Sequence, residues 1–136
     1  MGEGGGETGV AVMTQSLWIA GPLPGVNELL AAAKSGHGRG NAYSRLKAEW
    51  KTTVHYLAIH ARLRPHTGPV KIAFDWIERN RRRDPDNFTG GGRKLILDGL
   101  VAAGVLQNDG WAQVWSFSDR WSVGVPGVTV TISDVD

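Results

Sequence analysis

Residues 70–77 read VKIAFDWI, and this segment decides the fold because it is the clearest β-strand in the sequence. Ile72, Phe74 and Trp76 alternate with Lys71 and Asp75, which is the period of two expected for a half-buried strand. A Gly-Pro pair stands directly before the segment and marks its start. Beyond its far end the chain enters a cluster of arginines and aspartates, so the strand delivers charged residues to one end of the predicted sheet.

An amphipathic helix is predicted upstream, from Ser44 until Pro65 ends it. Its apolar residues recur at steps of three and four and form a single stripe: Leu46, Trp50, Val54, Leu57 and Ala61. The opposite side carries Lys47 and Lys51.

The remaining elements follow from shorter patterns. Short apolar runs predict strands at residues 16–20, 114–117 and 128–132. A second helix is predicted after the three glycines at 90–92, and Gly104 is its C-terminal stop. The order strand, helix, strand, helix, strand, strand predicts a two-layer α/β (α+β) domain with a mixed sheet.

The composition limits the class of protein. The chain has 136 residues, a net charge of +2 and no cysteine, which indicates one ordinary globular domain without disulfides. Residues 1–12 are glycine-rich and are interpreted as a loose tail before a single domain at 13–136. No apolar run approaches the roughly 20 residues that cross a bilayer. We therefore expect a cytoplasmic protein without a membrane partner.

The segment Asp84-Pro85-Asp86-Asn87 places two carboxylates close together beside a block of arginines. Pro85 pushes Asp84 toward an extended conformation, in which residues i and i+2 point the same way. Two acids so placed can share a Mg²⁺ ion, which takes few protein ligands and keeps several waters. The same four residues also favour a simple turn.

Further charged residues follow along the predicted second helix. Asp109 lies in a loop that is expected to return to the sheet edge near Asp84, although Asn-Asp-Gly is also a favoured turn sequence. Asp98 follows Lys94 by one helical turn and is interpreted as its surface ion-pair partner.

The run Gly90-Gly91-Gly92-Arg93-Lys94 is expected to open a helix with free backbone N–H groups that attract an anion. Its spacing is not that of a Walker motif, so no nucleotide cofactor is indicated. A flexible, solvated loop is the alternative.

Several of these motifs together resemble a known family. Their sequences are Asp84-Pro85-Asp86-Asn87, the Lys94-x-x-x-Asp98 step, Gly104-Val105, and Asp109 followed by Gln113-Val114. This set resembles the RusA-type Holliday-junction resolvases, which are small bacterial and phage endonucleases. The likeness extends over nearly all of the chain after Met13.

The resemblance implies an activity and a set of site residues. Asp84, Asp86 and Asp109 would hold Mg²⁺, with Mn²⁺ as a possible substitute, and Lys94 would face the scissile phosphate. Asn87 would order the motif. The protein would be a homodimer that cuts four-way DNA junctions by paired symmetric nicks, in a bacterial cell or a phage-infected host. DNA contacts are expected from the basic residues and Asn87, namely Arg81, Arg82, Arg83, Asn87, Arg93, Lys47 and Lys51.

Two departures from the family pattern stand out. The usual spacing from the second acid to the lysine is four residues, whereas Lys94 follows Asp86 by eight, so Arg93 is an alternative for the basic role. Asn108 stands where the family often has an aspartate. Two alternative functions stay open: a nuclease for other branched DNA, and a junction-binding protein without catalytic activity. Two interpretations are open for Trp111, Trp115 and Trp121: stacking on bases, and a dimer or core contact.

Overall fold

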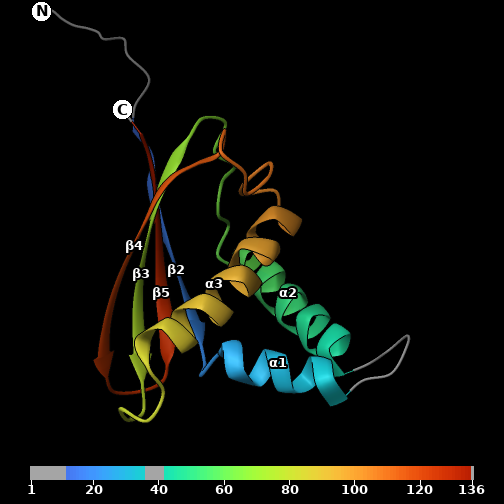
Figure 1. Ribbon diagram of the computed structural model, residues 1–136. Helices are drawn as coiled ribbons and strands as arrows, with labels where there is room; N and C mark the ends of the chain where they lie inside the picture. The colour runs from blue at the N-terminus through green and yellow to red at the C-terminus, as the bar shows by residue number, and fades with distance from the viewer. Residues whose placement is uncertain (1–11, 36–41, 136) are drawn as a thin grey trace, which may run out of the picture.

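In the described part of the chain, four strands and three helices form two layers, with the helices gathered on one face of the sheet (Figure 1). The computed structural model describes residues 12–35 and 42–135. The strands are β2 (Thr14–Ala20), β3 (Val70–Glu78), β4 (Val114–Val123) and β5 (Gly127–Asp134). The helices are α1 (Val26–Ser35), α2 (Ala42–His60) and α3 (Pro85–Ala102). The predicted two-layer α+β fold with a mixed sheet is confirmed.

The strand order across the sheet is β2-β5-β3-β4. β5 is antiparallel to both of its neighbours, whereas β3 and β4 run parallel. A parallel pair requires a crossover connection, and α3 provides it. The chain therefore leaves β3 at one end of the sheet and enters β4 at the other end.

The core lies between the sheet and the helices. Ile72, Phe74 and Trp76 are each at most 3% exposed, which confirms the alternation predicted for β3. Val54 of α2 and Leu100 of α3 are fully buried against them. Among the described residues, no helix combines the length and the apolar character needed to cross a bilayer.

The start of α3 differs from the prediction. The helix begins at Pro85, with Asp84 as its N-cap in an extended conformation, so the three glycines lie inside α3 instead of before it. Proline favours the first helical position because its fixed φ suits a helix and it has no N–H to leave unpaired. A side chain at Gly91 would lie 2.5 Å from the carbonyl carbon of Gly25. The glycine therefore permits close packing of α3 on the segment before α1.

Helix α1 was not predicted. Part of its stabilisation comes from far along the chain, because the N–H of Asn27 donates to Oδ1 of Asn87 at 2.8 Å. The N–H of Gly25 donates to Oε1 of Glu28 at 2.6 Å and closes the same end. Lys34 and Ser35 end this helix. Residues 36–41 and residues 1–11 of the predicted tail lie outside the described residues.

Candidate functional site

Asp84 and Asp86 lie at the N-terminus of α3, directly beyond the end of β3. Both residues are exposed, and neither carboxylate has a hydrogen bond or ion pair within the part of the chain that the structure describes. The extended conformation expected for Asp86 is wrong, because Asp86 belongs to the first helical turn. The helix dipole places partial positive charge at this end, which favours two carboxylates there.

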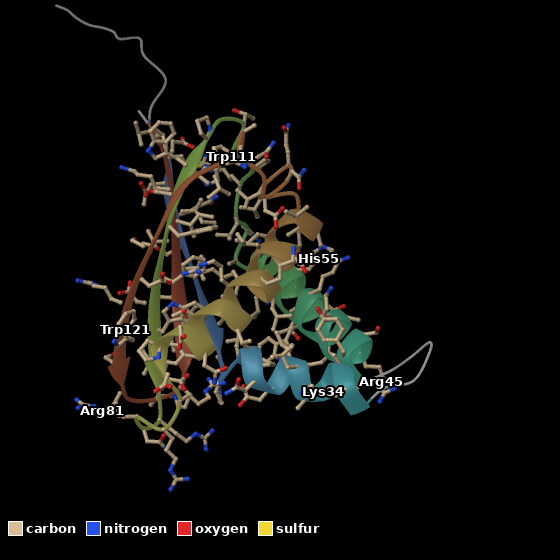
Figure 2. The ribbon with its side chains drawn as sticks, in the orientation of Figure 1. Lys34, Arg45, His55, Arg81, Trp111 and Trp121 are labelled. Carbon is tan, nitrogen blue, oxygen red and sulfur yellow. The ribbon has the colours of Figure 1, made fainter. Side chains whose placement is uncertain are left out.

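A surface pocket of about 720 Å³ opens beside Asp84. Figure 2 shows Arg81 and Trp121 at this end of the molecule. The other residues that line the pocket are Glu78, Asn80, Arg83, Asp84, Pro85, Phe88, Ser122 and Val123. Arg81 and Arg82 are both exposed, so a basic edge borders the two acids.

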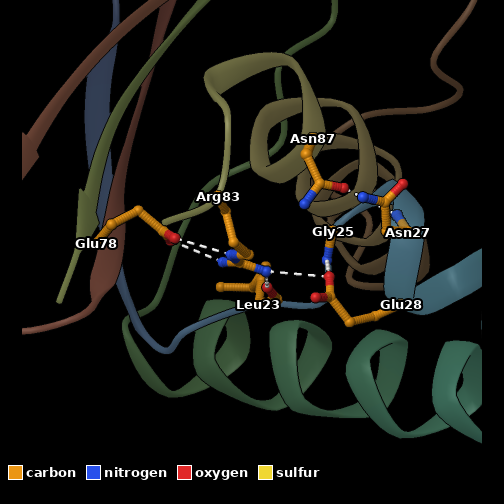
Figure 3. A network of polar contacts seen from close by, with 7 residues as sticks. All are labelled: Leu23, Gly25, Asn27, Glu28, Glu78, Arg83 and Asn87. Atoms are coloured by element: carbon orange, nitrogen blue, oxygen red, sulfur yellow. Dashed lines mark hydrogen bonds and ion pairs between the residues drawn. The ribbon is translucent and has the colours of Figure 1, made fainter. Parts of the chain in front are cut away.

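Arg83 is committed to contacts within the protein (Figure 3). Its guanidinium donates to both carboxylate oxygens of Glu78, at 2.8 and 2.7 Å, and to the carbonyl oxygen of Leu23 at 2.9 Å. It also pairs with Glu28 at 3.2 Å. The hydrogen bond with Glu78 is the main cause that raises the pKa of Arg83. The side chain predicted to contact DNA therefore ties β3 to the start of α1.

Asn87 also makes an internal contact. Its Oδ1 accepts from the N–H of Asn27, as described above, so this side chain joins the first turn of α3 to the first turn of α1. The expectation that Asn87 orders the motif agrees with this position. The same internal hydrogen bond does not support the predicted contact of Asn87 with DNA.

Lys94, Asp98 and Asp109 form a second cluster. Lys94 Nζ lies 3.0 Å from Oδ1 of Asp98, which confirms the predicted pair along the helix, and 3.5 Å from Oδ2 of Asp109. The hydrogen bond with Asp98 is the main cause that raises the pKa of Lys94. Lys51 of α2 helps to line a pocket of about 330 Å³ at this cluster. The chain thus brings three of the predicted charged residues together here.

Asp109 does not join Asp84 and Asp86. Lys94 is ten positions beyond Asp84 in the sequence, so about 15 Å of helix separates them. Asp109 also precedes β4, and the parallel crossover puts that loop at the opposite end of the sheet from the end of β3. Within residues 12–35 and 42–135, no three Asp, Glu or His side chains are grouped to hold a metal ion. The expected return of the Asp109 loop to the Asp84 edge is therefore wrong.

The extra spacing between Asp86 and Lys94 is built into α3 as helix. Four additional residues lengthen a helix by about 6 Å, or slightly more than one turn. Gly90 now occupies the position four residues after Asp86, where the resemblance leads us to expect a lysine. The glycines do not open the helix, so the predicted anion-binding N–H groups at Gly90–Gly92 are engaged in the helix interior.

Arg93 points into the domain. It pairs with Asp119 of β4 and lies over the rings of Phe74 and Phe117, at 5.2 and 4.8 Å from their centroids. Asp119 also accepts a hydrogen bond from Nε1 of Trp76 at 2.8 Å. Neither the proposed DNA contact nor the alternative catalytic role of Arg93 agrees with this inward position. The alternation along β4 was the sequence signal for Asp119, because it puts Asp119 on the same face as Phe117.

The remaining predicted side chains occupy several surfaces. Lys47 lies over the ring of Tyr43 on α2, at 5.1 Å from its centroid. Trp76 is buried, as expected, whereas Trp111, Trp115 and Trp121 are exposed. Trp111 and Trp115 therefore keep most of their surface outside the core, whereas the ring of Trp121 contacts the buried Phe88.

One buried polar cluster was not predicted. His66 is 4% exposed, and its Nδ1 lies 2.6 Å from Oδ1 of Asp134. Gln15 exchanges two hydrogen bonds with the backbone of Arg64, which points its amide N–H groups toward Nε2 of His66. Nε2 therefore accepts, and Nδ1–H donates to Asp134. This hydrogen bond and one from the N–H of Met13 lower the pKa of Asp134.

No protein-family model matches the chain, and no curated protein matches it significantly. The functional interpretation therefore depends on the geometry above and on the motif resemblance.

Proposed function

We propose that the chain is a Mg²⁺-dependent, structure-specific endodeoxyribonuclease that resolves four-way DNA junctions by paired symmetric nicks. The observation that carries this proposal is the pair of exposed carboxylates, Asp84 and Asp86, which lack protein partners in the described chain. Asp84 lines a pocket that the exposed Arg81 also lines. Carboxylates without an internal cation, beside exposed arginines, fit a site for a divalent cation and a phosphate.

Asp84 at the N-cap and Asp86 in the first turn of α3 would hold Mg²⁺ through their two carboxylates. Oxygen ligands from Asp84 and Asp86 suit this ion, which keeps most of its water ligands in proteins. When bound there, Mg²⁺ supplies positive charge for the phosphate oxygens and acidifies a water molecule. Asp109 and Asp98 do not fit the same ion, because they lie beside Lys94, which about 15 Å of helix separates from Asp84.

The basic residues of the pocket edge have a separate task. Arg81 and Arg82 are exposed and free to contact phosphates, so they hold the DNA backbone next to the two acids. Binding through such contacts falls steeply as the salt concentration rises. Lys51, which lies beside the Lys94 cluster, and Lys47, one turn before it on α2, would add further phosphate contacts.

The activity is tested with a labelled four-way junction, a fork and a plain duplex, each with Mg²⁺ or with a chelator. Paired symmetric nicks in the junction alone, abolished by the chelator and by Asp86→Asn, are the expected result. Cleavage of the fork at an equal rate would replace the junction by branched DNA in general as the substrate. Full cleavage by Asp86→Asn would remove the proposed site.

A second candidate function is junction binding without cleavage. The observation that favours it is the additional turn of α3, which separates Lys94 from the two acids by about 6 Å more than the family spacing would. In the same assay this candidate predicts a gel shift of the junction and no nicks in Mg²⁺ or Mn²⁺.

Both candidate functions, cleavage and binding, involve a four-way junction, which has approximate two-fold symmetry. A homodimer would present one site to each of two strands, so we propose a dimer and the bacterial or phage-infected cytoplasm as its setting.

A further inference from the structure

Trp121 of β4 presents a large aromatic surface beside the proposed metal site. Its register partner on β3 is the buried Trp76, whereas Trp121 itself is 54% exposed. Trp121 and Asp84 line the same pocket, and Figure 2 shows Trp121 at the same end of the molecule as Arg81. The cation and phosphate contacts proposed above give this ring no task.

The ring of Trp121 is anchored on one side by packed neighbours. Phe88 of α3 is buried and meets Trp121 edge-on, with 6.4 Å between the ring centroids and an interplanar angle of 79°. The guanidinium of Arg83 lies 6.0 Å from the centroid of Phe88 and is itself fixed by its pair with Glu78. An edge-on contact engages at most one face of the indole. Trp121 therefore combines an anchored side with a side that faces solvent.

The pocket has a suitable size and lining for a nucleobase. Its volume of about 720 Å³ lies within the range of about 300–1,000 Å³ that is usual for small-ligand sites. Pro85, Phe88 and Trp121 supply apolar surface to its lining. Bases stack on aromatic side chains of this kind in proteins that bind single-stranded nucleic acid.

The charges in the lining favour a phosphate close to that base. Of the two acids in the lining, Glu78 is paired with Arg83, whereas Asp84 belongs to the proposed metal site. The exposed Arg81 supplies a positive charge. Because these residues and Trp121 line one pocket, a strand with its scissile phosphate at Asp84 brings a neighbouring base to Trp121 and a neighbouring phosphate to Arg81.

We propose that Trp121 is a stacking platform for one unpaired base next to the scissile phosphate, and that this contact selects branched DNA over plain duplex. The inference rests on the proposed nuclease function and names the feature of the substrate that the site recognises. In a duplex, a base reaches such a pocket only after it has been unpaired and unstacked, which costs free energy. At a branch point the stacking is already interrupted, so this cost is lower.

The other exposed tryptophans do not share this position. Trp111 is fully exposed and Trp115 is 70% exposed, yet neither lines the pocket that contains Asp84. Trp111 also lies in the segment before β4, at the opposite end of the sheet from the end of β3. Trp111 therefore provides a matched control for Trp121.

The contact is tested by a thermodynamic cycle that removes the ring and the base separately. Binding of a four-way junction is measured in a chelator at low salt, so that no cleavage occurs, with the unmodified chain and with Trp121→Leu. Each nucleotide next to the branch point is replaced, one position at a time, by an abasic analogue. At one position, we expect the base to contribute on the order of tenfold to the affinity of the unmodified chain and less than about twofold to that of Trp121→Leu.

Two further variants separate stacking from a structural role. Trp121→Leu keeps an apolar contact with Phe88 but has no flat ring, whereas Trp121→Phe restores a ring and is expected to recover at least about a threefold contribution of the base. Trp111→Leu is expected to leave that contribution unchanged. Because both tryptophans are at least half exposed, all three variants are expected to fold, which urea denaturation verifies.

Two results would overturn the stacking contact. One is an equal contribution of the base in the unmodified chain and in Trp121→Leu at every position. The other is a change in the oligomeric state of Trp121→Leu without DNA, measured by sedimentation, because the ring would then serve a contact between copies. Nicking of the junction without this coupling would reject the stacking contact and leave the nuclease proposal standing. Coupling without nicking would do the reverse, and a chain that binds no junction would reject both.

Discussion

Lys94 Nζ lies 3.5 Å from Oδ2 of Asp109. This contact joins the middle of α3 to the loop before β4 and supplies the third predicted acid with a cation from the protein itself. A carboxylate so engaged has less need of a metal ion than Asp84 or Asp86.

The two groups of acids are therefore expected to respond differently to substitution. Asp86→Asn should weaken Mn²⁺ binding, measured by electron paramagnetic resonance titration, by at least tenfold because it removes one of two ligands. Asp109→Asn should change it less than twofold. Equal losses in both variants would mean that Asp109 reaches the same ion, as the resemblance implies and this geometry does not.

Gly90 offers a direct test of the lengthened helix. Gly90→Lys restores a lysine at the family spacing on an exposed position, and its Cβ would meet only Cγ2 of Val26, at 3.0 Å. We expect it to raise the rate of junction cleavage at least tenfold relative to Gly90→Gln, which has similar length and no charge. Both variants should also stabilise the fold by about 0.5 kcal/mol, because glycine is a poor helix former. Indistinguishable cleavage rates would show that the missing lysine is not what limits catalysis.

Arg83 and Arg82 are adjacent in sequence but differ in role. Arg83→Gln should lower the free energy of unfolding by about 2 kcal/mol, because it leaves the half-buried carboxylate of Glu78 without its bidentate partner. Arg82→Gln should change stability by less than about 0.5 kcal/mol, because Arg82 is exposed. Urea denaturation measures both. Arg82→Gln should instead weaken junction binding and reduce its salt dependence, and unchanged binding would remove Arg82 from the DNA surface.

Asp134 should make stability depend on pH in the acidic range. Its pKa is lowered in the folded state, so its contribution is fully present above the ordinary aspartate pKa of about 3.9 and is lost as the pH falls through the folded value. The difference in unfolding free energy between the unmodified chain and Asp134→Asn should therefore hold from neutral pH to about pH 5 and close below about pH 4. Asp75→Asn, at an exposed ion pair with Arg120, should show no comparable difference. A difference in unfolding free energy between these two proteins that persists at pH 2 would show that it does not come from the ionised carboxylate of Asp134.

The sequence predicted the elements whose stabilisation is local or periodic. The alternation of Ile72, Phe74 and Trp76 and the stripe around Val54 both correspond to the core that is observed. The sequence did not predict the position of Asp109, because spacing along a chain does not reveal that β3 and β4 are parallel. In a parallel pair, the loop after β3 and the loop before β4 lie at opposite ends of the sheet.

Side chains with a long-range partner were also missed or misassigned. Arg83 and Arg93 were predicted to contact DNA because they are basic. Instead, Arg83 pairs with Glu78 and Arg93 pairs with Asp119. Gly91 was expected to open the helix within an anion-binding run, whereas its actual neighbour is the backbone at Gly25. In each case the deciding contact involves a residue in another element, which a local pattern does not contain.

The cap that Asn87 provides to α1 has a consequence for the order of folding. A helix of ten residues is too short to persist alone in water, and α1 receives part of its N-terminal stabilisation from a side chain of α3. We therefore expect α1 to become ordered only after α3 has packed on the sheet, and to be the first helix to open in local unfolding. In hydrogen exchange, amides of α1 should lose protection before those of α3, and Asn87→Ala should accelerate exchange in α1 while leaving the central strands unchanged. Uniform protection across both helices would instead mean that the domain opens as a single unit.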